Sequence, residues 1–242
     1  HRHTVNAYYT GKVKDWTIDV NMDGMWYRNY EKDWNNSTYQ QVNQEEQTLL
    51  VTSTVHNTHH LYATKLVLTH PLAGGTLSFG GEYSHSKRTN LFVNPQGIVA
   101  DDDSYSKEGI ASAFVEYGRQ IGKASLQAGV RYEHVAFDYY IKNVHRKDMS
   151  RTTDDFFPSL GLSFPIGKVQ MQLGYAKDIL RPSFSQLSGE VTYNNRYTYQ
   201  TGNPLLLPMT TDNISLNAIY RGARLSVGYQ HIKNQACYQS IP

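Results

Sequence analysis

Apolar and polar residues alternate one by one in five stretches of this 242-residue chain, which begin near residues 15, 75, 123, 168 and 223. Successive side chains of a β-strand point to opposite faces, so each stretch predicts a strand with one apolar and one polar face. In the third stretch, Leu126 and Val130 fall on the apolar face, whereas Gln127 and Arg131 fall on the polar face. Five further stretches complete hairpins with these: 4–10, 47–70, 108–117, 155–164 and 211–220.

The junctions between the predicted strands alternate strictly between short and long. The short, turn-rich junctions are 11–14, 71–75, 119–123, 165–168 and 221–222. The long, polar junctions are 29–46, 87–107, 142–154 and 178–210. We therefore predict an all-β chain, an antiparallel up-and-down meander of about ten strands, with every short turn at one end and every long loop at the other.

Composition narrows the class of protein further. The chain has 19 Tyr, 8 Phe and 3 Trp, and its 23 basic and 21 acidic residues give a net charge of +2. This balance excludes an electrostatic nucleic-acid binder, and the aromatic content argues against disorder. The single cysteine, Cys237, excludes an internal disulfide and a Cys-based zinc site.

Alternation by itself does not separate a soluble β-sandwich from a transmembrane β-barrel, because both have one apolar and one polar strand face. Two features favour the barrel. The polar face carries Glu82, Arg131 and Glu133 in mid-strand, which suits a water-filled lumen. Short turns at one end and long loops at the other are the usual layout of an outer-membrane barrel. The mean hydropathy of -0.56 does not oppose this interpretation, because a transmembrane β-strand needs only every second residue to be apolar.

Four tyrosines support the same interpretation. Tyr83, Tyr132, Tyr175 and Tyr229 each lie six residues after the first apolar position of their strand. Six tilted residues climb roughly 15 Å, so these side chains are predicted to lie at a membrane interface, where one end of a tyrosine is apolar and the other wet.

Several segments resemble TonB-dependent outer-membrane receptors, and more narrowly their outer-membrane β-barrel branch. Residues 175–184 combine an aromatic strand end with the sequence RPSF, and residues 202–208 read GNPLLLP. Residues 61–72 and 129–133 fit the same branch. Phe184 stands where the branch usually has Tyr, and Met209 stands where an acidic residue is common.

The resemblance implies a receptor for active nutrient uptake in the outer membrane of a Gram-negative cell. Such receptors have a 22-stranded barrel, a plug domain and a TonB-contact segment. We therefore expect residues 1–242 to form a partial outer-membrane β-barrel domain without plug or TonB-contact segment. The implied partners are outer-membrane lipid, the plug domain and TonB system of the full-length protein, and a small-molecule or oligomeric nutrient. No nucleic acid, cofactor or enzymatic activity is expected.

The best candidates for ligand contact lie in the last long junction, where aromatic faces and directional hydrogen-bonding groups come together. They are Tyr193, Asn195, Arg196, Tyr197 and Tyr199. No metal site is predicted, although the chain has 10 histidines. His59 and His60 are adjacent, for example, and so face opposite sides of a strand.

Two alternatives stay open at the level of the sequence. One is a soluble β-sandwich adhesin or carbohydrate-binding module. The other is a ten-stranded outer-membrane protease, in which an acidic loop and histidines near strand ends would activate water: Asp102, Asp103, His85, His134 and His231. A closed ten-stranded barrel fills its interior with side chains. The polar face here is rich in Ser and Gly, which are too small to fill such an interior. The ten strands are therefore not expected to close on themselves, and the first strand, 4–10, should not pair with the last, 228–234.

Overall fold

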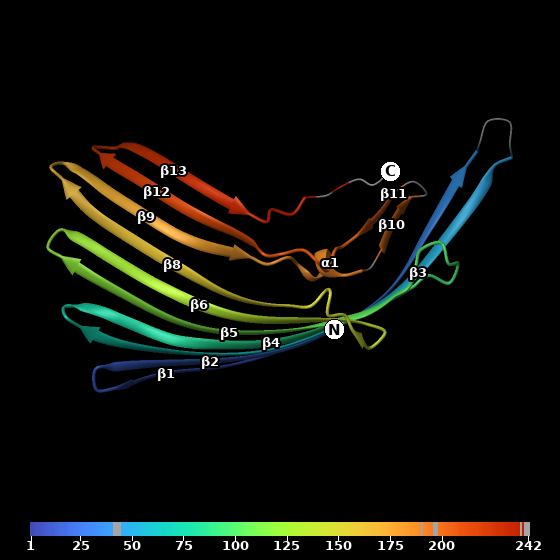
Figure 1. The fold of residues 1–242 in the computed structure, drawn as a ribbon, viewed down its shortest axis with the longest axis horizontal. Helices are drawn as coiled ribbons and strands as arrows, with labels where there is room; N and C mark the ends of the chain where they lie inside the picture. Colours follow the sequence, from blue (N-terminus) through green and yellow to red (C-terminus); the bar gives the residue numbers. More distant parts are fainter. Residues whose placement is uncertain (41–44, 190, 196–197, 238, 240–242) are drawn as a thin grey trace.

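The computed structural model describes residues 1–40, 45–189, 191–195, 198–237 and 239. Ten strands follow one another as neighbours in a single antiparallel sheet, which confirms the predicted meander. Figure 1 shows them as one curved layer. They are β1 (Arg2–Val13), β2 (Trp16–Tyr39), β3 (Gln47–Leu72), β4 (Gly75–Val93), β5 (Asp102–Ile121), β6 (Ala124–Ile141), β8 (Arg151–Ile166), β9 (Val169–Leu180), β12 (Met209–Tyr220) and β13 (Ala223–Lys233).

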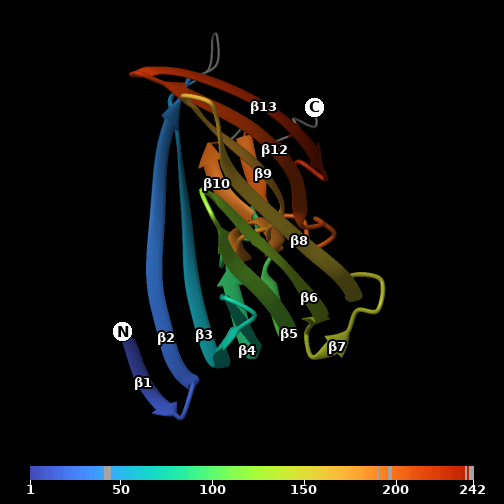
Figure 2. The same ribbon diagram turned by 90° about the vertical axis from the view of Figure 1, so that its left-hand side faces the viewer.

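Four smaller elements lie in the connections on the long-loop side. Strand β7 (Val144–His145) pairs with β6, and the chain between β9 and β12 holds the helix α1 (Phe184–Leu187) and the hairpin of β10 (Val191–Asn195) and β11 (Thr198–Thr201). Seen from a second side, α1 and this hairpin lie within the curve of the sheet (Figure 2). No helix in the described ranges combines the length and the apolar composition needed to cross a membrane.

All short turns lie at one end of the sheet and all long connections at the other, as predicted (Figure 1). The β3–β4 turn consists of Ala73 and Gly74, both with positive φ, and the β12–β13 turn consists of Arg221 and Gly222, also both with positive φ. Two positive φ values give a two-residue turn the twist of the strands that it joins. These turns therefore fix the register of their hairpins.

The predicted lengths of two long loops were wrong. Strand β2 stays paired up to Tyr39, inside the predicted loop 29–46, whereas β3 begins at Gln47 as predicted. Strands β4 and β5 likewise extend to Val93 and Asp102, inside the predicted loop 87–107. Alternating hydrophobicity ends where the apolar medium ends, but backbone hydrogen bonds continue the ladder beyond that point. A polar hairpin therefore has the sequence signature of a loop.

The register confirms the predicted division of side chains between the two faces. Directly paired residues share a face, and Leu126, Leu173 and Val227 belong to one continuous row of pairs from β6 to β13. Gln127 belongs to the neighbouring row, which reaches Gly228. We call the face with Leu126 the outer face and the face with Gln127 the inner face.

Aromatic side chains on the outer face reveal the tilt of the strands. The row of pairs that contains Tyr229 on β13 reaches Ala128 on β6, four strands away, and Leu77 on β4, six strands away. Tyr132 and Tyr83 lie four and six residues beyond that row. From Tyr229 to Tyr132 and Tyr83 the tyrosines thus advance by about one residue per strand, which keeps these three at one depth if the strands tilt by about 35°, the value of transmembrane barrels. Tyr175 lies in the same row of pairs as Tyr229, two strands away. We call Trp26, Tyr62, Tyr83, Tyr132, Tyr175 and Tyr229 the aromatic belt.

Within the described residues, buried apolar side chains pack together in two small clusters, both on the inner face. In the first, Val55 and Phe92 pack with Val99 from the β4–β5 connection. In the second, Phe137 and Tyr139 of β6 pack with Leu187 of α1. The described residues form no second large sheet against the first, so the sandwich alternative is not supported.

Candidate functional site

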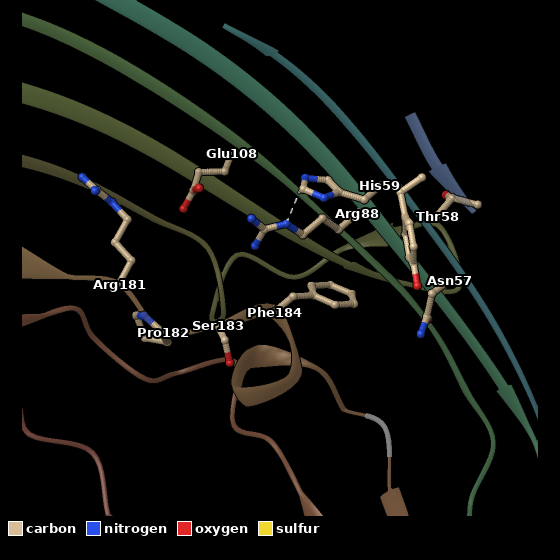
Figure 3. Close-up of a pocket in the computed structure, with 10 residues that line it drawn as sticks. Asn57, Thr58, His59, Arg88, Glu108, Arg181, Pro182, Ser183 and Phe184 are labelled. Atoms are coloured by element: carbon tan, nitrogen blue, oxygen red, sulfur yellow. Dashed lines mark hydrogen bonds between the residues drawn. The ribbon is translucent and has the colours of Figure 1, made fainter. Parts of the chain in front are cut away.

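The segment after β9 folds back over the inner face of the sheet and closes one side of a pocket (Figure 3). The other side of the pocket comes from the long-loop ends of β2, β3, β4 and β5. This side consists mainly of the side chains of Tyr27, His59, Arg88 and Glu108. Residues 181–184 face them across the cavity. The cavity has a volume of about 500 Å³, enough for a small organic ligand.

Helix α1 anchors this segment. Ser183 and Gln186 form a capping box at its start: the Ser183 side chain accepts from the Gln186 backbone, and the Gln186 side chain accepts from the Ser183 backbone. Leu187 then packs on Phe137 and Tyr139 of β6. At the end of the helix, the Asn90 amide donates to the Ser188 hydroxyl at 3.3 Å. Local capping thus shapes the turn, and packing on the sheet places it.

A buried carboxylate holds the start of the same segment. Glu133 is only 2% exposed and forms ion pairs with Arg131 of its own strand and with Arg181. One carboxylate cannot satisfy two guanidinium groups completely, and the Nε atoms of Arg131 and Arg181 are buried without a hydrogen-bond partner in the described chain. The sequence predicted that Arg131 and Glu133 face the lumen, and the structure confirms it. Their partner, Arg181, was not foreseen.

Arg88 is the second cation of the pocket. Its Nε donates to Nε2 of His59 at 3.3 Å (Figure 3), and its guanidinium lies 5.8 Å from the centre of the Phe184 ring. His59 lies three residues beyond Tyr62 on the long-loop side of the belt, and so outside the band expected to cross the membrane. There, burial and the neighbouring Arg88 lower the pKa of His59 to about 4. His59 is therefore neutral at physiological pH and can accept this hydrogen bond.

The pocket is suited to a ligand that carries both negative charge and a flat or apolar portion. Guanidinium groups bind carboxylate and phosphate in a planar, bidentate manner. Phe184 and Tyr27 supply aromatic surface, and Oδ1 of Asn57, which is unpaired in the described chain, is free to accept a hydrogen bond from a ligand. Glu108 adds an acceptor of opposite charge. No catalytic step follows from this set of groups.

The residues predicted to touch a ligand lie elsewhere. Tyr193 and Asn195 belong to β10 and Tyr199 belongs to β11, and the backbones of Tyr193 and Tyr199 pair directly. Arg196 and Tyr197 lie outside the described residues. Their role in ligand contact stays a prediction.

Sequence reasoning missed the residues that line the pocket. In the sequence, His59, Arg88 and Glu108 are polar residues near predicted strand ends. Residues 181–184 stand out only through their resemblance to the receptor family. The alternation pattern places a residue on the inner face, but the fold-back of residues 181–189 is what turns that part of the face into a pocket.

Metal binding and nucleophilic catalysis are two further chemistries to test against the described side chains. No three His, Cys, Asp or Glu side chains gather into a metal site within the described ranges. His145 contacts both Asp138, at 3.1 Å, and Ser150, at 3.0 Å, but both contacts use the same atom, Nε2. A catalytic triad needs the carboxylate on one ring nitrogen and the hydroxyl on the other. The Ser150 hydroxyl donates instead to the carbonyl of Arg146, which makes it a structural group.

The residues of the protease alternative do not converge. His85, His134 and His231 lie on the outer face, on three different strands. Asp103 shares this face but pairs with Leu91, six residues from His85, whereas Asp102 lies on the inner face and binds the Asn90 amide at 2.7 Å. The described parts of β1 and β13 do not pair with each other, as expected, so these ten strands do not close into the small barrel that the alternative requires.

Comparison with known proteins agrees with this architecture. The sequence model of the outer membrane protein beta-barrel family matches residues 10–241. The chain belongs to this family. Its location in the outer membrane agrees with the apolar outer face and the aromatic belt. A comparison with curated protein sequences gives no significant match.

Solved structures with a similar fold include outer-membrane transporters and receptors. The copper transporter OprC has a TM-score of 0.65 at 9% identity, over 94% of this chain and 38% of that one. The ferric-catecholate import receptor Fiu from K12 E. coli has a TM-score of 0.65 at 11% identity, over 97% of this chain and 41% of that one. The ferric yersiniabactin uptake receptor FyuA from Yersinia pestis has a TM-score of 0.55 at 12% identity, over 96% and 35%. At these identities the likeness establishes the fold, and the chain spans only about two fifths of the first two proteins.

Proposed function

We propose that this chain forms part of the wall of a TonB-dependent outer-membrane receptor that imports a nutrient. The observation that carries the proposal is a tilted, single-layer sheet with an apolar outer face and a charged pocket on its inner face. A wall of this kind separates lipid from a lumen that admits a ligand. The fold shared with a copper transporter and two import receptors supports the same function.

The proposal includes a larger barrel. The outer edges of β1 and β13 carry unpaired backbone groups in the described chain, and such edges recruit further strands. Residues 1–242 would thus be a partial barrel domain, and the plug domain and the TonB system would act as partners within the whole receptor. In such a receptor, the present segment would contact the nutrient, and the plug domain would respond to TonB.

The pocket supplies the ligand-binding part of the proposal. Arg88 and Arg181 would hold an anionic group of the nutrient, and Phe184 would cover its flat portion. The hairpin residues Tyr193, Asn195, Arg196, Tyr197 and Tyr199 remain candidates for further contacts from the long-loop side. We propose no catalytic residue.

Uptake by cells that carry the full-length protein tests this function. Cells would be grown on ferric complexes, oligosaccharides or peptides as the limiting nutrient, with and without an uncoupler that dissipates the membrane potential. We expect one nutrient class to require both the protein and an energised membrane. Arg88→Gln should impair its uptake, whereas Lys65→Gln, which removes a cation from the inner face below the belt, should not. Uptake that persists after uncoupling, or equal uptake without the protein, contradicts the proposal.

A further inference from the structure

Each residue of the aromatic belt is followed by a basic residue on the same face. Two positions beyond each belt aromatic, towards the long loops, the outer face carries Arg, Lys or His. The six basic residues, in the order of the belt, are Arg28, His60, His85, His134, Lys177 and His231. Two residues correspond to roughly 5 Å along the barrel axis, which is the level of lipid headgroups just above an interfacial belt.

The two halves of this basic ring differ in their counter-charges. In the half formed by β6 to β13, the Asp154 carboxylate lies 2.8 Å from His134. The Lys177 ammonium lies 3.5 Å from the Asp155 carboxylate, and Asp212 is the direct pair of both Lys177 and His231 in the ladder. These cations are therefore at least partly balanced by the protein itself.

The half formed by β2 to β5 has almost no counter-charge. Arg28, His60 and His85 are joined on its outer face by Lys87 and Lys107, and above the belt the described parts of these four strands present a single outer carboxylate, Asp103. We call Arg28, His60, His85, Lys87 and Lys107 the basic outer patch. The acidic residues of the same region, such as Glu108, lie on the inner face.

Lys87 and Lys107 are direct cross-strand pairs, so two like charges face each other across the ladder. Such a pair destabilises a sheet. In the described chain, neither ammonium group forms an ion pair. Asp138 is the ladder neighbour of Lys107, but its carboxylate lies 3.1 Å from His145 instead.

Two stacked tyrosines hold these lysines in place. The rings of Tyr105 and Tyr140 lie 4.4 Å apart. The Lys87 ammonium lies 5.1 Å from the centre of the Tyr105 ring, and the Lys107 ammonium lies 5.3 Å from that of Tyr140. Both charges are therefore positioned together on the outer face, where a bound anion would relieve their repulsion.

We propose that the basic outer patch binds the phosphate groups of outer-leaflet lipid headgroups. The patch lies on the lipid-facing side, just above the apolar band, and consists of basic side chains alone. Phosphate complements it in charge, and Lys and Arg are the side chains that bind phosphate most often. This site is separate from the inner pocket, and it does not depend on the proposed transport function.

The test uses the full-length protein in uncharged detergent micelles, titrated with diphosphoryl lipid A or with phosphatidylethanolamine. Bound lipid is counted by native mass spectrometry. We expect the protein to retain lipid A in preference to phosphatidylethanolamine. Each lysine near an anionic surface contributes about five-fold in affinity, so the double variant K87Q/K107Q should bind lipid A about 30-fold more weakly.

Three controls separate this proposal from simpler explanations. K123Q/K168Q removes two lysines at the short-turn end and should bind lipid A like the wild type. K87R/K107R keeps both charges and should also retain binding, and the single variants K87Q and K107Q would each show a partial loss if the double variant does not fold. Inorganic pyrophosphate should displace lipid A only weakly, because it lacks the acyl chains that dock below the belt.

Equal retention of lipid A by K87Q/K107Q and K123Q/K168Q overturns the proposal. So does displacement of lipid A by pyrophosphate at equal concentration, which would indicate a site for soluble phosphate. Because nutrient uptake is not measured, failure of the transport proposal would leave this result unchanged.

Discussion

The part of the sheet below the aromatic belt and the part above it are stabilised in different ways. Every buried residue of the described chain lies on the long-loop side of the belt, among them Val55, Asn90, Glu133 and Tyr139. Below the belt, outer apolar side chains such as Leu173 remain 41% exposed. The upper part folds on itself, through loops that pack on the inner face. The lower part has no core, and its apolar surface is buried only when lipid covers it.

The same strands thus pass through two environments, lipid below the belt and water with packed loops above it. Below the belt, the medium on each face, lipid outside and water inside, determines which residue types are tolerated. Substitutions there should therefore change stability almost independently of one another. Above the belt the contacts are specific, because Glu133, Arg181 and Leu187 are each placed by partners far away in the sequence. Substitutions should therefore act through lipid depth below the belt and through particular contacts above it.

The largest expected effect is that of a charge on the lipid face. Met171 lies four residues below Tyr175 on the outer face, near the middle of an apolar band about 25 Å tall. Met171→Arg should destabilise the full-length protein by about 2–4 kcal/mol, whereas Gln172→Arg, one residue away on the inner face, should cost little. Reversible unfolding from lipid bilayers measures both. Equal costs at the two positions would show that the faces do not separate lipid from lumen.

Above the belt, the largest effect should come from the contact between α1 and β6. Leu187 is 4% exposed and packs on Phe137 and Tyr139. Leu187→Ala should cost about 2–3 kcal/mol in the docking of residues 181–189, in the lower part of the range for buried leucines. Amide hydrogen exchange should rise in this segment but not in β13. A uniform rise over the whole sheet would indicate that the segment does not dock as a separate unit.

Glu133→Gln should have a somewhat smaller effect. It removes the charge that two guanidinium groups share, and leaves both without an anionic partner in a partly buried place. The expected cost is about 1–3 kcal/mol, with release of residues 181–184 to proteolysis. Glu82→Gln is the matched control, since Glu82 lies on the same face but forms no ion pair in the described chain. Loss of protection in the control alone would contradict this account of the site.

The smallest effect is expected at an exposed pair in the β6–β8 connection. Arg146 donates two hydrogen bonds to Asp148, at 3.0 and 2.7 Å, and they lower the pKa of that carboxyl group. A lowered pKa stabilises the fold above the ordinary pKa of Asp and loses this contribution as the pH falls through the folded value. Because the pair is fully exposed and screened, Asp148→Asn should leave the unfolding midpoint unchanged at neutral pH. A clear drop in that midpoint would show that the connection carries more stability than its contacts indicate.

The sequence alone determined the strand order, the turns and the two faces. Alternation is a local signal, since each residue reports the medium on its own side of the strand. Short turns need particular residues within a few positions, so hairpins such as Arg221–Gly222 were predictable as well. The belt was visible for the same reason, because Tyr83, Tyr132, Tyr175 and Tyr229 each lie six residues after the first apolar position of their strand.

The extent of β2, β4 and β5 beyond the apolar band, and the contacts of the charged residues on the inner face, came only from the three-dimensional structure. Polar residues look alike in a loop and in a hairpin that is paired above the membrane. Arg181 is 48 residues away from Glu133, and Arg88 is further still from Phe184, so no local pattern links them. The pocket and the basic outer patch both arise where the register brings distant residues side by side, which depends on strand pairing and on the fold-back of one segment rather than on sequence spacing.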